Sequence, residues 1–155
     1  MVDFPQYGGC LCGDVRYRLD EDPVTLYACH CTDCQRQSGS SFALTLVARS
    51  EAVAVVRGQP EERSVTLPDG RVKSASVCGR CDTRLLFPSR VAGLRGIEPG
   101  TLDDTSWLRP AGHIWTRSAQ PWVAIPDGAL RFEEQPRDGE MLSLVRAWKA
   151  GAKTA

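Results

Sequence analysis

The sequence has little histidine, no excess of charge and no long apolar run. Only two of its 155 residues are histidine, and 19 basic residues balance 19 acidic ones. A chain without net charge has no field that draws it to nucleic acid or to an anionic membrane, so neither is expected as a partner. The longest apolar run, residues 42–48, is interrupted by Thr45 and is far shorter than the ~20 residues of a membrane-spanning helix.

Several functional signatures are also missing. Residues 1–9 contain neither the basic nor the apolar stretch of a secretory signal, so we expect a cytoplasmic protein. The sequence contains no G-x-S-x-G motif, no phosphate-binding P-loop and no dinucleotide-binding fingerprint. None of these three sites is therefore expected.

Short alternating or β-branched runs, separated by 10 prolines and 14 glycines, predict a mainly β fold. In one such run, Val15, Tyr17 and Leu19 alternate with arginines, which is typical of a half-buried strand. Pro68-Asp69-Gly70 is a strong hairpin signal. Strands are expected over residues 14–19, 24–28, 42–47, 53–57, 63–67, 71–77, 84–87, 91–97, 113–116 and 129–132.

The C-terminal segment has a different period. Met141, Leu144, Val145 and Trp148 recur at the spacing of one helix face, which predicts an amphipathic helix. Asp138 is the expected N-cap, and a glycine at 151 can end the helix. We therefore expect a β domain over residues 1–135 and a C-terminal helix and tail over residues 136–155. The helix either packs on the β domain or binds a partner.

Seven cysteines carry the chemistry of the sequence, and all of them fall in three clusters. An odd number fits poorly with a closed set of disulfides, and thiols in a reducing cytosol more often bind a metal or act in catalysis. Cys-x-x-Cys turns and Cys-x-Cys segments both bring two sulfurs to one zinc ion. The clusters are Cys10-Leu11-Cys12, Cys29-His30-Cys31-Thr32-Asp33-Cys34 and Cys78-Gly79-Arg80-Cys81.

Locality favours one division of these ligands. Cys29, Cys31 and Cys34 lie within six residues and can form a three-thiolate site alone. The remaining pairs, residues 10 and 12 with residues 78 and 81, then form a four-thiolate site. A closed four-ligand zinc site is structural, whereas a site with an open position is catalytic or binds substrate. Two zinc ions per chain are expected.

Other interpretations of the cysteines stay open at this point. The two Cys-x-x-Cys turns can instead pair as a zinc ribbon, which leaves Cys10, Cys12 and Cys29 for the other metal. A redox-active Cys-x-x-Cys pair is disfavoured because no βαβ pattern accompanies it. An iron–sulfur cluster uses the same thiolate ligands as zinc and is a further alternative.

Three other side chains are candidates for a role. His30 lies between two cysteines and, on a strand, would point to the face opposite both, so a structural or solvent-facing role is favoured over metal ligation. His113 lies in a predicted strand and is expected to be a hydrogen-bonded core residue. Arg36 follows the three-cysteine cluster and can hold a substrate carboxylate, although a plain surface arginine is the competing interpretation.

The motifs resemble the glutathione-dependent formaldehyde-activating enzyme family, which is also represented in centromere protein V. The resemblance runs from about Tyr7 to Glu134 and is carried by residues 8–13, 29–36, 78–81, 100–104, 113–115 and 121–122. It implies a β-tent fold of antiparallel sheets. It also implies a structural zinc on Cys10, Cys12, Cys78 and Cys81 and a catalytic zinc on Cys29, Cys31 and Cys34. Asp82 stands where the family usually has glycine, and aspartate tolerates the left-handed backbone better than most residues.

The activity implied by the resemblance joins glutathione and formaldehyde to S-hydroxymethylglutathione and is classed, in reverse, as that of a carbon–sulfur lyase. A small thiol such as glutathione is thus the expected partner, and a homodimer is compatible with the sequence. Two alternatives belong to other classes of protein. One is a non-catalytic zinc module that binds a protein or chromatin, and the other is a sensor whose thiolates react once with an electrophile.

Overall fold

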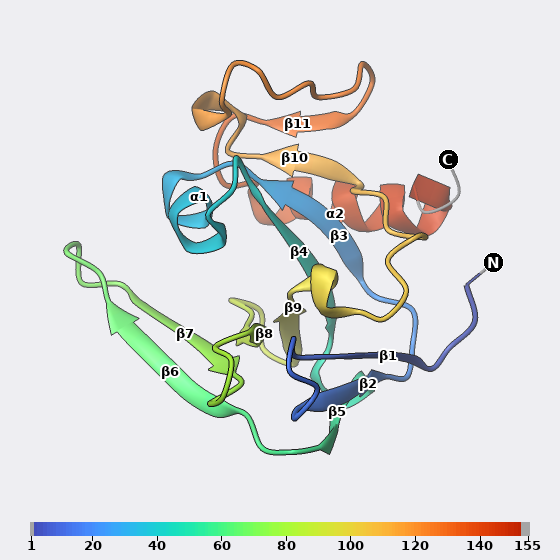
Figure 1. The fold of residues 1–155 in the computed structure, drawn as a ribbon. Coiled ribbons are helices and arrows are strands. Elements are labelled where there is room, and N and C mark those ends of the chain that lie inside the picture. Colours follow the sequence, from blue (N-terminus) through green and yellow to red (C-terminus); the bar gives the residue numbers. More distant parts are fainter. Residues whose placement is uncertain (1, 153–155) are drawn as a thin grey trace. The chain divides into compact units, whose positions relative to one another are not determined.

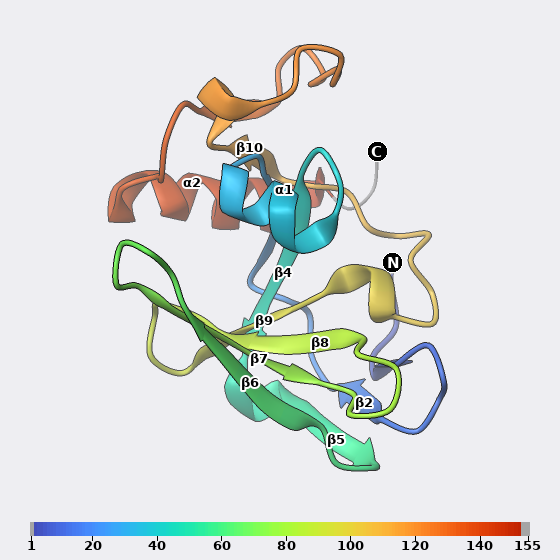
Figure 2. The ribbon, with the colours of Figure 1, turned by 60° about the vertical axis from the view of Figure 1, so that its left-hand side comes forward.

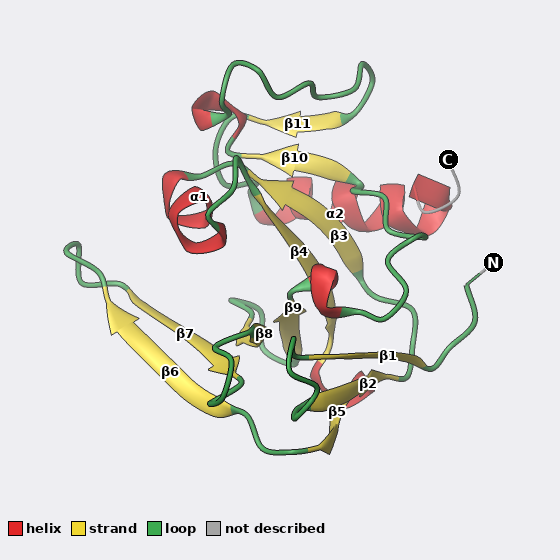
Figure 3. Ribbon diagram, viewed as in Figure 1, coloured by secondary structure: helices red, strands yellow, loops and turns green. Residues whose placement is uncertain are grey.

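The computed structural model describes residues 2–152, and its secondary structure is mainly β, as predicted (Figures 1 and 3). The chain divides into two compact units. One comprises Met1–Pro23 and Val47–Ser106, and the other comprises Val24–Leu46 and Trp107–Ala155. This division leaves the predicted boundary after residue 135 untested. Among the described residues, no helix combines the length and apolar character needed to cross a membrane.

The first unit contains seven strands that pair with one another as two groups. Strands β1 (Gln6–Gly9), β2 (Arg16–Leu19) and β5 (Val53–Arg57) form an antiparallel sheet in the order β1-β2-β5. Strands β6 (Glu61–Thr66), β7 (Val72–Val77), β8 (Arg84–Pro88) and β9 (Leu94–Ile97) pair antiparallel in chain order (Figure 2). The unit also contains the short 3-10 helices η1 (Ser50–Ala52) and η2 (Pro99–Thr101).

The expected alternation is confirmed, because Val15, Tyr17 and Leu19 are buried while Arg16 and Arg18 between them are half-buried. The hydroxyl of Tyr17 lies 2.8 Å from that of Thr101, and burial raises the Tyr17 pKa to about 12. The predicted hairpin forms between β6 and β7, where the backbone N–H of Leu67 donates to Arg71 and Gly70 has a left-handed φ of 84°. Buried residues of these strands form the core of the unit.

The second unit contains β3 (Thr25–Cys29), β10 (Gly112–Ile114), β11 (Leu130–Phe132) and the start of β4 (Ala43–Arg49), in the order β11-β10-β3-β4. Strand β10 runs parallel to both β3 and β11. Long connections permit this, since parallel neighbours need a crossover rather than a tight turn. The sheet is thus mixed, whereas the family resemblance implied antiparallel sheets.

Helix α2 (Asp138–Ala147) continues into η4 (Trp148–Ala152), which confirms the predicted C-terminal helix. Leu144 and Trp148 are fully buried, and the Thr25 hydroxyl of β3 donates to the Leu144 carbonyl over 3.2 Å. The helix therefore packs on β3 of its own unit. The N-cap position is Arg137 and not the predicted Asp138, because the Glu140 carboxylate accepts the Arg137 backbone N–H at 2.8 Å.

Two local departures from the predicted strands have a backbone cause. Residues 91–93 form a turn before β9, closed by the Leu94 N–H on the Val91 carbonyl, with Gly93 at a φ of 77°. Strand β10 ends at Ile114 because Trp115 takes a left-handed φ of 59°, which starts the 3-10 helix η3 (Thr116–Ser118). The other predicted strands were found with ends shifted by a few residues.

Gly58 provides a test of the packing in the first unit. Its φ is 70°, and a Cβ added to it would overlap the carbonyl oxygen of Asp14, whereas a Cβ at Gly70, with a φ of 84°, meets open space. Both alanine variants carry a left-handed cost of about 1–2 kcal/mol. We expect Gly58→Ala to lower the free energy of unfolding, measured by urea titration, by about 2 kcal/mol more than Gly70→Ala. Equal losses in the two variants would show that the Asp14 carbonyl does not exclude a Cβ at position 58.

Candidate metal centres

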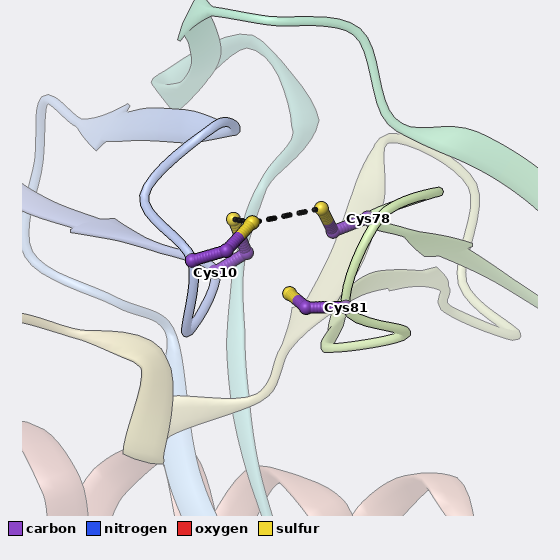
Figure 4. Close-up of side chains that lie close together, drawn as sticks. Cys10, Cys78 and Cys81 are labelled. Atoms are coloured by element: carbon purple, nitrogen blue, oxygen red, sulfur yellow. Dashed lines mark hydrogen bonds between the residues drawn. The ribbon is translucent and has the colours of Figure 1, made fainter.

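Four cysteines of the first unit converge from two loops. Cys10 and Cys12 lie in the turn between β1 and β2, and Cys78 and Cys81 lie in the loop between β7 and β8. Their sulfur atoms all lie within 4.8 Å of one another. Figure 4 shows the Cys10, Cys78 and Cys81 side chains turned toward a common space. The loops thus form one group of four thiols, called here the four-cysteine group.

Backbone hydrogen bonds shape each of these loops. The Cys10 N–H donates to the Val15 carbonyl at 3.0 Å, and the Val15 N–H donates to the Cys10 sulfur at 3.2 Å. In the second loop the Asp82 N–H donates to the Cys78 carbonyl at 2.9 Å, with Asp82 at a left-handed φ of 56°. The prediction that aspartate accepts this conformation is confirmed.

The sulfur spacing in the four-cysteine group fits a tetrahedral zinc ion. Sulfurs bound at about 2.3 Å to one zinc lie about 3.8 Å apart. The Cys10 and Cys12 sulfurs are 3.5 Å apart, and those of Cys12 and Cys78 are 3.7 Å apart. Two neighbouring pairs therefore already have nearly the separation that the metal requires.

The thiols of the four-cysteine group differ in pKa. Hydrogen bonds from the side chain and then the backbone of Thr83 lower the pKa of Cys81 to about 6. The backbone N–H of Asp14 lowers the pKa of Cys12, but removal from water and the Cys10 sulfur outweigh it and raise that pKa to about 12. Ionising all four sulfurs therefore requires a cation, and zinc thiolate sites supply one.

The second unit holds the other three cysteines, called here the three-cysteine group. Cys29 ends β3, Cys31 is the N-cap of helix α1 (Thr32–Ser38), and Cys34 lies in its first turn. Their sulfurs also lie within 4.8 Å of one another. The Cys34 N–H donates to the Cys31 sulfur at 3.3 Å. Helix α1 was not predicted, and it is the element that folds the three thiols together.

Cys29 is buried, whereas Cys31 and Cys34 are half-buried. Hydrogen bonding to Cys31 and then to Cys34, together with burial, raises the pKa of the Cys29 thiol above its ordinary value. This group therefore also needs a cation to become fully ionised. Zinc held by these three sulfurs would have one ligand position left for another molecule, because it prefers four ligands.

The structure brings together the two groups of cysteines that locality favoured. None of the seven cysteines forms a disulfide.

The two histidines form a buried pair beside the three-cysteine group. His30 Nε2 lies 2.9 Å from His113 Nδ1, and both rings are buried, so the expected core role of His113 is confirmed and a solvent-facing His30 is wrong. Burial lowers the pKa of His30. Burial and the adjacent His30 ring together lower the pKa of His113 to about 4. Both rings are therefore neutral at neutral pH. His30 packs against Phe42, with ring centroids 5.3 Å apart.

A chain of amide hydrogen bonds runs from His30 to an exposed tryptophan. The Gln35 side-chain N–H groups donate to the carbonyls of His30 and Ser118 at 2.7 and 2.8 Å. Gln120 Nε2 donates to Gln35 Oε1 at 3.0 Å, and Trp122 Nε1 donates to Gln120 Oε1 at 2.8 Å. Because Gln35 uses both N–H groups on carbonyls, its amide orientation is fixed.

Sequence analysis did not find this chain of amides. Gln35 and Gln120 are 85 positions apart, and no local pattern marks either of them. The Ser118 hydroxyl also donates to the His30 carbonyl, at 3.1 Å, and the left-handed Trp115 begins the turn that contains it. Only the tertiary structure shows that these residues hold the backbone between Cys29 and Cys31.

Arg36 is exposed and lines a surface hollow of about 550 Å³. The other lining side chains come from α1, the loop after it and the segment after η3. They include Gln35, Ser40, Ser41, Gln120 and Trp122.

The chain is similar to a known protein family and to a solved structure. A family model described as glutathione-dependent formaldehyde-activating enzyme matches residues 5–118, which include all seven cysteines. A crystal structure of a Rhodobacter sphaeroides protein matches with 20% identity and a TM-score of 0.51, covering 64% of this chain and 90% of that one. This likeness shows the fold alone. No curated protein matched the chain.

Gln35 is expected to support metal binding by the three-cysteine group. In Gln35→Glu, a carboxylate replaces an amide that donates to two carbonyl oxygens. Partners outside the ligand set typically contribute about 10- to 100-fold to metal affinity. We expect Gln35→Glu to weaken the weaker zinc site at least about tenfold, measured by competition with a chromophoric chelator. Gln37→Glu, an exposed position of the same helix with the same change of charge, is the control. Equal affinities in the two variants would contradict the role of Gln35.

The purified, reduced protein is expected to bind two zinc ions of unequal affinity. A closed group of four sulfurs holds its ion more tightly than a group of three with an exchangeable fourth ligand. Graded chelation should therefore remove about one equivalent first while circular dichroism still shows the folded protein. One equivalent or none at saturation would refute the assignment of two sites.

Proposed function

Since the chain belongs to the glutathione-dependent formaldehyde-activating enzyme family, we propose that it is a zinc-dependent enzyme of the carbon–sulfur lyase type. The proposed reaction joins glutathione and formaldehyde to S-(hydroxymethyl)glutathione. The single observation that carries this proposal is the convergence of Cys29, Cys31 and Cys34, which leaves one tetrahedral ligand position for the sulfur of a substrate.

The four-cysteine group has a structural role in this proposal. Cys10, Cys12, Cys78 and Cys81 occupy all four ligand positions, so no position is left for substrate. The group also fastens the β1–β2 turn to the β7–β8 loop. It is therefore the part of the first unit that metal loss would loosen.

The three-cysteine group has the catalytic role. Zinc held by Cys29, Cys31 and Cys34 would lower the pKa of a bound thiol substrate and keep its sulfur nucleophilic. Helix α1 fixes Cys31 and Cys34, while Gln35 and Ser118 hold the His30 carbonyl and with it the backbone between Cys29 and Cys31. A fixed backbone presents the substrate sulfur in one orientation, which supplies part of the rate gain through proximity.

The reaction balances without an oxidant or a reductant. The glutathione sulfur forms a bond to the formaldehyde carbon, and the π bond of the carbonyl breaks toward oxygen. The thiol proton passes to solvent water, and the new alkoxide takes a proton from solvent to become the hydroxyl group. The reverse reaction breaks the same carbon–sulfur bond.

The buried, neutral pair of His30 and His113 forms part of the structure that supports the three-cysteine group.

The experiment that tests this function measures exchange between glutathione and ¹³C-formaldehyde by NMR. With the two-zinc protein, the exchange rate is expected to exceed the uncatalysed rate in proportion to protein concentration. Cys31→Ser should return it to the uncatalysed rate. Absence of any acceleration with glutathione or other small thiols would leave a non-catalytic zinc-binding interaction module as the better account.

Substitutions in the two groups of cysteines should have different effects. Structural zinc binding is worth about 10–16 kcal/mol in zinc-finger peptides, whereas a domain is stable by about 5–15 kcal/mol. Cys78→Ser is therefore expected to lower the melting temperature sharply or to prevent folding, and Cys31→Ser to remove activity with a smaller shift. Similar melting temperatures in the two variants would count against this division of roles.

A further inference from the structure

We infer that the surface hollow beside helix α1 binds a carboxylate of the peptide part of the thiol substrate, with Arg36 as the cation that recognises it. This inference rests on the proposed function and specifies its substrate class as a thiol that carries a carboxylate and amide groups. Simple thiols without these groups would reach the three-cysteine group but gain nothing from the hollow.

The hollow and the three-cysteine group are parts of one local structure. Helix α1 begins after Cys31 and carries Cys34, and the next two residues, Gln35 and Arg36, line the hollow. The Gln35 amide contacts the carbonyl of His30, between two of the cysteines, at 2.7 Å. The α-helical rise places Arg36 about 7.5 Å along the axis from Cys31. A residue of extended peptide spans about 3.3–3.6 Å, so a carboxylate one or two residues from a cysteine sulfur covers a similar length.

The charge of the hollow selects an anion. Arg36 is the only charged residue among those that line it. Among residues 2–152, no carboxylate forms an ion pair with Arg36. An arginine guanidinium binds a carboxylate through two parallel hydrogen bonds, which gives geometry as well as affinity. Nine other arginines of the described residues form an ion pair with a carboxylate, whereas Arg36 is available for an external one.

Two other residues that line the hollow are held in place by the chain of amides. Trp122 is 73% exposed, yet its indole N–H is fixed on Gln120 at 2.8 Å. Gln120 uses one N–H on Gln35 and keeps a second for another acceptor. The hollow thus combines a cation, an amide donor and an exposed aromatic ring. That combination suits the carboxylate, carbonyl and methylene groups of a short peptide.

The test uses S-methylglutathione, which keeps the peptide and both carboxylates but cannot form a thiolate. Isothermal titration calorimetry of the two-zinc protein should detect binding, and Arg36→Gln should weaken it about tenfold, the effect of losing a charged hydrogen-bonded partner. The matched control is Arg146→Gln, which removes an exposed arginine from α2 in the same unit and should change nothing. The diethyl ester of S-methylglutathione lacks free carboxylates and should bind weakly to wild type and to Arg36→Gln alike.

Two further measurements separate this inference from the proposed function. Trp122→Leu should also weaken S-methylglutathione binding, and circular dichroism of each variant checks that it is folded. Affinity that is unchanged in folded Arg36→Gln, or an ester that binds as tightly as the free acid, would overturn the inference. If wild type still accelerates exchange between formaldehyde and glutathione in that case, the proposed function stands. If wild type accelerates no exchange with any thiol, the function fails whatever the hollow binds.

Discussion

The crowding of thiols is the constraint on which the rest of this structure depends. The cysteines form two sets, and within each set the sulfur atoms lie within 4.8 Å of one another. In each set at least one thiol has a raised pKa. Neighbouring thiolates repel one another, so only a cation among them makes full ionisation favourable. The fold therefore brings together thiols that become fully ionised only with a bound cation.

The two groups meet this constraint in different ways. The four-cysteine group joins loops 66 or more residues apart, as the contact between Cys12 and Cys78 shows, so a metal held there would stabilise tertiary structure. The three-cysteine group forms within a strand end and one short helix, so a metal held there would be bound locally. The hydrogen bonds of Gln35 and Ser118 supply the rigidity that such a short segment lacks. This difference supports the proposal that the four-cysteine group serves stability and the three-cysteine group serves chemistry.

Much of this arrangement could be predicted from the sequence, because the signals are local. Cysteine spacing gave the two groups, alternation gave strands such as β2, and a period of 3.6 residues gave helix α2. Helix α1 was missed because it has only seven residues and begins within the cysteine motif. The parallel pairing of β10, the left-handed Trp115 and the link from Gln35 to Gln120 depend on contacts distant in sequence, which single-residue preferences do not encode.

The central claim is that the three-cysteine group keeps one ligand position for the sulfur of a substrate. Cobalt(II) in place of zinc tests it directly, because the sulfur-to-cobalt charge-transfer band reports the set of bound sulfurs. Glutathione added to the cobalt protein is expected to intensify and shift this band, and Cys31→Ser is expected to lose the response. A spectrum that stays unchanged at saturating glutathione would contradict the claim.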